Sequence, residues 1–216
     1  MSHERVPYVL RQGDYLAKLP HVFGFDADEV WKDPKNEVIR SLRVDHNILA
    51  PGDIVYLPKV PKDGLPILKG KVNAYTAKVP TVEVALAFQN ADGTPLADEP
   101  YEVQGVDLPS GSQKTDGEGK LRVQLRVTIR AVTIVFPERH FEYTARVGDL
   151  DPLAEQSGVE QRLENLAVLV RDAGSAPLDE DALRAAITVF QAKKGLDPTG
   201  TLDEATRGAL LEEHGV

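Results

Sequence analysis

The fold of the C-terminal part of the chain is decided by residues 179–196, DEDALRAAITVFQAKKGL. Its apolar residues recur at the i, i+3, i+4 and i+7 spacing of one helix face, at Leu183, Ala186, Ile187 and Phe190. Asp179 is placed to cap the start of this helix. Gly195 is placed to end it, because glycine readily adopts the left-handed backbone of a C-terminal cap. The stretch therefore predicts one amphipathic helix.

Two shorter helices are predicted on either side of it. Upstream, Ser157 and Glu160 have the spacing of a capping box, and the helix that they open carries an apolar stripe at Val159, Leu163, Leu166 and Val170. Downstream, the turn at 197–200 leads to Asp203, which is placed to cap a last helix carrying Ala205, Ala209 and Leu210. Residues 151–216 are therefore expected to form a three-helix bundle around one small core.

This order of residues resembles the peptidoglycan-binding three-helix domain that is often appended to cell-wall hydrolases. The matching positions are Val159, Arg162, Leu163 and Leu166, then Ala186, Phe190, Gln191, Gly195 and Leu196, then Thr199, Gly200, Leu202, Asp203, Thr206 and Leu210. The glycine-rich turn that the family usually has between its first two helices is replaced by residues 172–178, DAGSAPL. The resemblance implies that Gln191 and Thr206, in a groove between helices, meet a glycan or a stem peptide. Phe190 and the leucines are expected to be core.

Composition limits the possible functions. The 216 residues are 42% hydrophobic and 27% charged, as in globular proteins, and contain no cysteine. Disulfides, thiolate catalysis and cysteine-ligated zinc are therefore excluded. The net charge of -9 is divided as 0 for residues 1–62, -1 for 63–148 and -8 for 149–216. An acidic C-terminal part is not expected to bind nucleic acid or an anionic membrane.

The N-terminal residues 1–60 predict a strand, two helices and a second strand that pairs with the first. Tyr8 lies in a short strand that runs into the turn Gly13-Asp14, and residues 47–58, NILAPGDIVYLP, form another turn and strand. Between them, Asp26 and Glu29 form a capping-box pair. Residues 33–40 are expected to add a helical turn or two.

This pattern resembles the LysM domain, a module that binds glycans containing N-acetylglucosamine. The signature is carried by Tyr8, Gly13, Asp14, Ile48, Pro51, Gly52, Asp53, Val55, Leu57 and Pro58. The resemblance implies a shallow sugar groove between two loops, one with Gly13, Asp14, Tyr15 and Leu16, the other with Asn47, Ile48, Leu49 and Ala50. Three features depart from the family: Tyr15 replaces a common threonine, Pro20 interrupts the first helix, and the 32–46 connection is long. The domain is therefore expected either to bind glycan or to serve as an adaptor surface.

Residues 61–70 are rich in proline and glycine, and we expect a semi-stiff linker that keeps the N-terminal domain from packing tightly onto the rest. From 71 to 150 the apolar period changes to two, in runs that begin at Val82, Leu121, Val132 and Phe141 and are bounded by turns. Such strands predict an antiparallel β-sandwich. The turns at 92–96 and 115–121 are similar to those of bacterial immunoglobulin-like and carboxypeptidase-regulatory-like domains, which implies a spacer or docking domain.

The sequence offers no catalytic constellation. The five histidines (His3, His21, His46, His140 and His214) never have metal-ligand spacing, and the acidic clusters fall at helix ends or on polar faces. Neither a nucleophile elbow nor a glycine-rich phosphate loop is present. We therefore expect no catalytic residue, metal or cofactor.

The sequence predicts a multidomain α+β protein: a LysM-like βααβ unit at 1–60, a linker at 61–70, an antiparallel β-sandwich at 71–150 and a three-helix bundle at 151–216. The predicted function is non-enzymatic binding of peptidoglycan or another N-acetylglucosamine glycan. No signal peptide or membrane span is recognised, so synthesis in the cytoplasm is expected, with no membrane and no nucleic acid as partner. The domain order resembles accessory proteins of contractile (type VI-like) secretion systems, which implies a spike or toxin protein as partner and delivery to the envelope. The alternatives are a protein-protein adaptor without glycan affinity and a cell-wall hydrolase.

Overall fold

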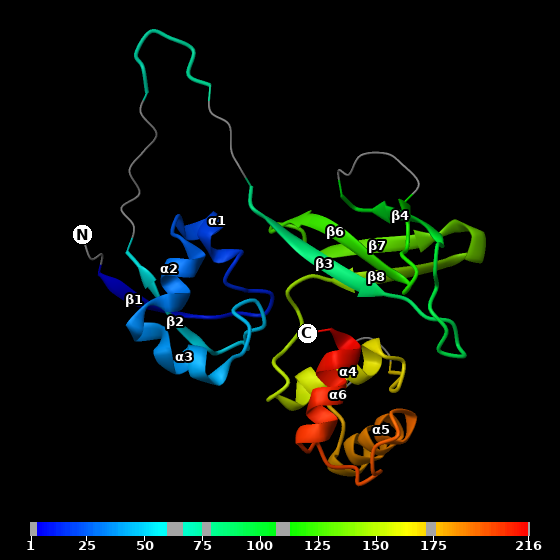
Figure 1. Ribbon diagram of the computed structural model, residues 1–216. Coiled ribbons are helices and arrows are strands. Elements are labelled where there is room, and N and C mark those ends of the chain that lie inside the picture. Colours follow the sequence, from blue (N-terminus) through cyan, green and yellow to red (C-terminus); the bar gives the residue numbers. More distant parts are fainter. Residues whose placement is uncertain (1–3, 60–66, 75–78, 107–112, 172–175, 216) are drawn as a thin grey trace. The chain divides into compact units, whose positions relative to one another are not determined.

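A computed structural model describes residues 4–59, 67–74, 79–106, 113–171 and 176–215 (Figure 1). In this part of the chain the protein is mixed α/β, with α-helices at both ends of the sequence and antiparallel sheets. The chain divides into two compact units, residues 1–149 and 150–216. Most of the predicted linker, residues 61–66, lies outside the described residues.

The N-terminal part of the first unit pairs its two end strands, as predicted. Strand β1 (Arg5–Val9) is antiparallel to β2 (Ile54–Pro58), with Tyr8 opposite Val55. Between them lie α1 (Leu19–Phe23), α2 (Ala27–Lys32), the 3-10 helix η1 (Pro34–Asn36) and α3 (Glu37–Leu42). One cluster of buried side chains joins helices and strands: Leu10, Leu16, Leu19, Val30, Ile39, Leu49, Val55 and Leu57.

Local rules explain most of these helix boundaries. The Asp26 carboxylate accepts the backbone N–H of Glu29 at 3.0 Å and caps α2, as predicted. Pro20 does not interrupt a helix, contrary to expectation. It lies in the first turn of α1, where a backbone N–H would have no helical partner, so its missing donor costs little. The expected extra helical turns after residue 33 are η1 and α3.

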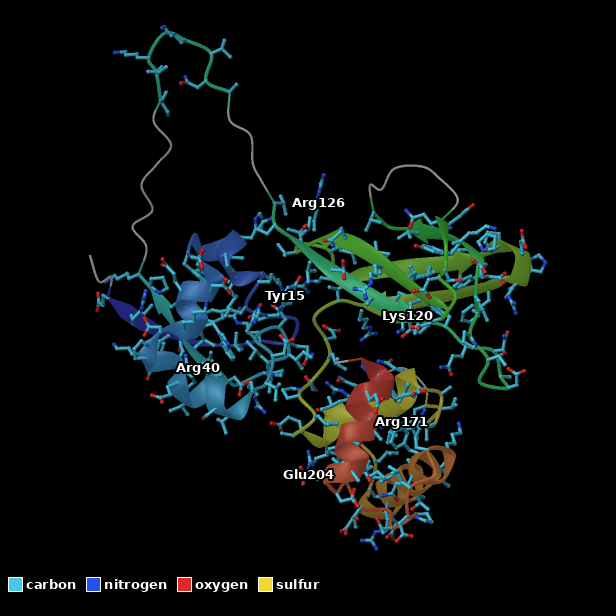
Figure 2. All side chains as sticks on the ribbon, in the orientation of Figure 1. Tyr15, Arg40, Lys120, Arg126, Arg171 and Glu204 are labelled. Carbon is cyan, nitrogen blue, oxygen red and sulfur yellow. The ribbon has the colours of Figure 1, made fainter. Side chains whose placement is uncertain are left out.

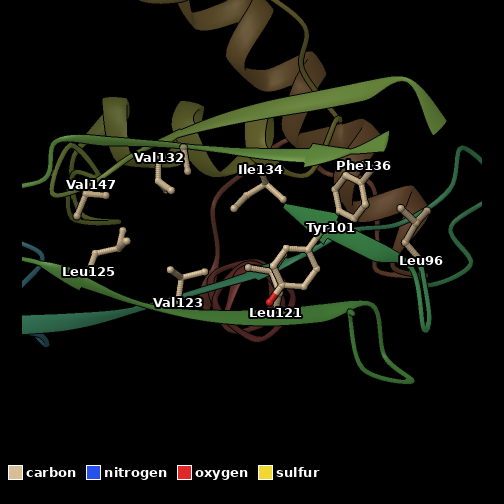
Figure 3. Close-up of a cluster of buried hydrophobic side chains, with 10 residues drawn as sticks. Leu96, Tyr101, Leu121, Val123, Leu125, Val132, Ile134, Phe136 and Val147 are labelled. Atoms are coloured by element: carbon tan, nitrogen blue, oxygen red, sulfur yellow. The ribbon is translucent and has the colours of Figure 1, made fainter. Parts of the chain in front are cut away.

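The rest of the first unit contains two antiparallel sheets. Strand β3 (Thr81–Ala87) pairs with β6 (Lys120–Arg126), and the second sheet has the order β5-β4-β7-β8. Its members are β5 (Gln113–Lys114), β4 (Pro100–Gln104), β7 (Ala131–Phe136) and β8 (Phe141–Arg146), with the 3-10 helix η2 (Pro137–Arg139) between the last two. Alternating side chains of β6 and β7 meet in one buried cluster (Figure 3). The sequence pattern predicted β3, β6, β7 and β8 but did not identify the short β4 and β5.

The second unit contains α4 (Gln156–Asn165), α5 (Glu180–Lys193) and α6 (Glu204–His214). The predicted caps are confirmed: Asp179 accepts the N–H of Ala182 and Asp203 accepts that of Thr206, both at 2.8 Å. Gly195 has the predicted left-handed backbone, with φ of 67°. The three helices share a buried apolar cluster of Val159, Leu163, Ala186, Ile187, Phe190 and Leu210.

Helix α4 differs from its prediction at both ends. It begins at Gln156, and its cap residue, Glu155, makes no capping hydrogen bond through its side chain, so the expected box at Ser157 does not form. The Glu160 carboxylate instead accepts the backbone N–H of Leu178 and pairs with Arg171. The helix ends at Asn165, which leaves Val170 outside the predicted stripe and 88% exposed.

Candidate functional site

The two loops of the predicted sugar groove lie against each other. The N–H of Leu16 donates to the carbonyl of His46 at 3.0 Å, and the N–H of Ala17 donates to Oδ1 of Asn47 at 3.1 Å. The structure therefore brings the predicted loops together. It also uses two of their backbone donors internally, and these donors are no longer available to a ligand.

The side chains of this region are less accessible than the sequence suggested. Of the eight predicted contact residues, Tyr15, Leu16, Leu49 and Ala50 are buried, with exposed fractions of 2%, 0%, 5% and 7%. Gly13, Asp14, Asn47 and Ile48 are half-buried. Leu16 and Leu49 belong to the apolar core, because the loops must cover the ends of the helices. Among the eight residues, the four half-buried ones therefore present more surface to solvent than the four buried ones, and glycan contact by the eight stays a prediction.

Tyr15 packs against the part of the first unit that contains the two sheets. Its hydroxyl donates to the carbonyl of Val127 at 3.3 Å, and its ring lies over Gly148 (Tyr15 is labelled in Figure 2). A Cβ at Gly148 would lie 2.6 Å from the ring, so only glycine allows this approach. Burial raises the pKa of the Tyr15 phenol. Tyr15 therefore acts as a packing anchor within the first unit, which also departs from the expectation that the linker holds the N-terminal part away from the sheets.

Asp14 is engaged with its neighbours. Its carboxylate accepts the Tyr8 hydroxyl at 2.9 Å and lies 3.5 Å from the Lys18 ammonium, which also donates to the carbonyl of Gly13. Burial, followed by the hydrogen bond to Asp14, raises the pKa of Tyr8. These contacts stabilise the turn after β1.

An aromatic and polar surface adjoins the second loop. The rings of Trp31 and His46 are 5.9 Å apart and tilted, and Nδ2 of Asn47 lies 3.2 Å from Nε2 of His46. Trp31 is half-buried, so part of its indole faces solvent. Sequence analysis did not assign Trp31 to the site, since α2 is 15 residues away from the loop along the chain.

The N-terminal part also exposes many large apolar side chains. Eight of them between residues 4 and 59 are at least 36% exposed: Val6, Val9, Val22, Phe23, Val38, Leu42, Val44 and Ile54. Val9 and Ile54 are direct partners across the β1-β2 ladder, 55% and 49% exposed. Val38 and Leu42 are one turn apart on α3, 72% and 61% exposed. Sequence analysis did not predict this surface. One signal of it is that α3 contains three apolar residues, of which only Ile39 is buried.

Gln191 and Thr206, the predicted glycan contacts of the C-terminal part, are adjacent but inside the protein. They are 0% and 1% exposed. The Gln191 amide donates to Thr206 Oγ1, the Thr201 carbonyl and Thr199 Oγ1 at 2.9, 3.0 and 3.1 Å, and its Oε1 accepts the Gly200 N–H at 2.8 Å. The two side chains hold the turn between α5 and α6 and have almost no exposed surface, and the glycan contact expected of them stays a prediction.

A second buried polar group lies at the start of α4. The Arg162 guanidinium, 1% exposed, donates to the carbonyls of Asp151 and Gly158, both at 2.8 Å. Burial lowers the pKa of Arg162 to about 10, against a smaller opposing effect of Asp151. Sequence analysis assigned no role to Arg162. In the structure its hydrogen bonds connect Asp151, which lies before α4, with the helix.

Within the described residues, no group of three or more His, Asp or Glu side chains is arranged to hold a metal ion. No helix in that part of the chain is long and apolar enough to cross a membrane. Comparisons with protein-family models, curated proteins and solved structures found no match to this chain.

Proposed function

We propose that this chain is a non-enzymatic adaptor that binds another protein through its N-terminal part. The observation that carries the proposal is the set of eight exposed large apolar side chains within residues 4–59. Contiguous exposed apolar surface on a soluble domain is typical of interaction sites. Scattered single residues need no explanation, but the cross-strand pair Val9 and Ile54 and the helical pair Val38 and Leu42 are local groups.

The proposal retains the modular interpretation of the sequence. The N-terminal part is proposed to be a LysM-like unit, the two sheets an immunoglobulin-like sandwich, and the C-terminal helices a peptidoglycan-binding-like bundle. The domain order supports an accessory role in a contractile secretion system, with a spike or toxin protein as partner. In this interpretation the modules act as docking surfaces, because the side chains expected to contact sugar are engaged internally.

The test is site-specific photo-crosslinking in the native host. A photo-reactive amino acid at Leu42 is expected to crosslink to one defined protein, encoded near this chain, whereas the same amino acid at the exposed Arg184 of α5 is not. Substituting the neighbouring Val38→Ser should reduce the crosslink by about tenfold, since a buried Val contributes about 1.5 kcal/mol or more at an interface. The same yield at Leu42 and Arg184, or no dependence on Val38, would contradict the proposal.

Glycan binding is retained as a second candidate because the two predicted loops do meet and Trp31, His46 and Asn47 adjoin them. Aromatic rings beside amide groups are suited to sugars, which offer an apolar face and hydroxyls. Pull-down of the full chain with insoluble peptidoglycan and with chitin tests this candidate. Retention that falls in Trp31→Ala but not in Phe23→Ala would favour the glycan, and the absence of retention would leave the protein adaptor alone.

A further inference from the structure

Residues 67–73 form a hydrogen-bonded turn whose large apolar side chains belong to none of the buried clusters. Ile67, Leu68 and Val72 are 78%, 62% and 96% exposed, and none belongs to a core of the first unit. The turn is centred on Gly70, whose φ of 79° lies in the left-handed region that favours glycine. Three neighbouring aliphatic side chains exposed on one short turn are typical of a segment that contacts another surface.

The turn satisfies its own backbone through Asn73. The Leu68 N–H donates to Oδ1 of Asn73 at 2.8 Å, and Nδ2 of Asn73 donates to the carbonyls of Leu68 and Lys71 at 3.1 and 3.0 Å. The Lys71 N–H also points to the Leu68 carbonyl, at 3.4 Å. Backbone groups that are bonded internally can leave water at low cost, which is the main requirement for entering an apolar boundary.

The turn itself carries two positive charges, and the nearest acidic residues along the sequence are Asp63 and Glu83. Residues 64–82 contain Lys69, Lys71 and Lys78 and no acidic residue. Lysine side chains near an anionic bilayer are attracted to it, while their aliphatic stems reach past apolar surface. The acidic residues that give the chain its net charge of -9 lie mainly after residue 148. At physiological salt a charge is screened over about 8 Å, so the lysines nearest to a bilayer contribute most to its attraction.

The composition favours a lipid surface over a protein partner. Energetically important residues of protein interfaces are mainly Trp, Tyr and Arg, and lysine is depleted from interface cores. Residues 67–73, ILKGKVN, contain none of the first three and two lysines. Three aliphatic side chains with two lysines between Leu68 and Val72 are compatible with a segment that inserts shallowly at the boundary of headgroups and acyl chains.

We propose that residues 67–73 form a membrane-surface anchor that inserts Ile67, Leu68 and Val72 into an anionic bilayer. The sequence led us to expect no membrane partner, because the C-terminal part is acidic and no spanning segment is recognised. The proposed anchor differs from that expectation. The anchor does not span the bilayer. It also does not depend on the proposed adaptor surface, which lies on other residues.

The experiment is co-sedimentation of the full chain with vesicles rich in phosphatidylglycerol and with vesicles of phosphatidylcholine alone. Binding is expected to the anionic vesicles, to weaken as salt is added, and to be much weaker on the zwitterionic ones. The double variant Lys69→Gln/Lys71→Gln should bind about thirtyfold more weakly, since each lysine contributes about fivefold. Removing two positive charges elsewhere, in Lys32→Gln/Arg126→Gln, should leave most of the binding intact.

The aliphatic side chains have their own variants. The triple substitution Ile67→Ser/Leu68→Ser/Val72→Ser should abolish sedimentation, whereas Val38→Ser/Leu42→Ser on α3, equally exposed, should not change it. Asn73→Ala should weaken binding at unchanged charge, although alanine is slightly more apolar than asparagine, because Leu68 and Lys71 lose their side-chain partner. Circular dichroism verifies that each variant is folded. A wild-type chain that stays in the supernatant with both vesicle types overturns the proposal, as does sedimentation that the triple serine variant leaves unchanged.

Discussion

Replacing Gln191 by leucine is expected to unfold the C-terminal unit more easily. Leucine has a similar volume but cannot bond the turn that Gln191 holds. The Gly200 N–H, bonded at 2.8 Å and buried, loses its acceptor, which costs about 1–3 kcal/mol. The Thr206 hydroxyl and the Thr201 carbonyl lose a donor and add about 1 kcal/mol together. The expected loss in free energy of unfolding is about 3 kcal/mol.

The turn offers little room to compensate for this loss. Gly200 has a left-handed backbone, φ 69°, and a Cβ there would come too close to Arg184 and Thr188, so the turn is packed against α5. The Gly200 N–H could reach another acceptor only if the turn moved away from α5, which would break this packing. A loss of 3 kcal/mol corresponds to a fall of roughly 15 °C in the midpoint of thermal unfolding for a unit of this size.

Far-ultraviolet circular dichroism of the full chain measures the effect, because α4, α5 and α6 are the longest helices described. A matched control is Gln104→Leu, an exposed glutamine of β4, for which a change of less than about 0.5 kcal/mol is expected. A Gln191→Leu chain as stable as wild type, but with reduced retention on peptidoglycan, would refute the structural role and restore Gln191 as a ligand contact.

Two further predictions concern pH and packing. Burial and the positive charge of Arg162 lower the pKa of His214 to about 4. The unfolded chain takes up a proton near pH 6.5, whereas the folded chain does not. The free energy of unfolding should therefore be highest above pH 6.5 and should fall by about 2 kcal/mol toward pH 4. Urea unfolding at both pH values checks this, and a His214→Gln variant with the same pH dependence would count against it. Gly148→Ala should lower the stability of the first unit by about 2 kcal/mol, because its Cβ meets the Tyr15 ring. Unfolding is followed by Trp31 fluorescence. The control is Gly52→Ala, at φ 94° with no atom within 4 Å of the added Cβ, which should cost only about 1 kcal/mol. Equal losses of stability in the two variants would argue against the Tyr15 contact.

The helix caps could be predicted from the sequence because their interactions are local. Asp26, Asp179 and Asp203 each accept a backbone N–H three residues ahead. The alternating strands could be predicted for the same reason, since side-chain period depends only on neighbouring residues. The capping box predicted at Ser157 has the same local pattern but does not form. The Glu160 carboxylate instead binds Arg171 and the N–H of Leu178, which lie 11 and 18 residues away along the chain.

The candidate site could not be predicted because exposure is a tertiary property. Tyr15 follows a Gly-Asp turn, a position that is usually at the surface. Its partners, Val127 and Gly148, are more than 100 residues away along the chain, and no local pattern connects them. The exposed pair Val9 and Ile54 shows the converse. Each is an ordinary strand residue in the sequence, and only the register of β1 with β2 places them together on the face away from the core.

Tyr15 and Gln191 together indicate which of the predicted contact residues are accessible to a ligand. A residue that serves a ligand must keep polar groups or an apolar face accessible when the ligand is absent. Both side chains are instead at most 2% exposed and bonded inside the protein. A ligand would have to replace these hydrogen bonds one for one, with little net gain, and would also lose the packing around them. Tyr15 and Gln191 are therefore better explained as residues that hold the protein together, and contact with partners is better sought where apolar side chains remain uncovered.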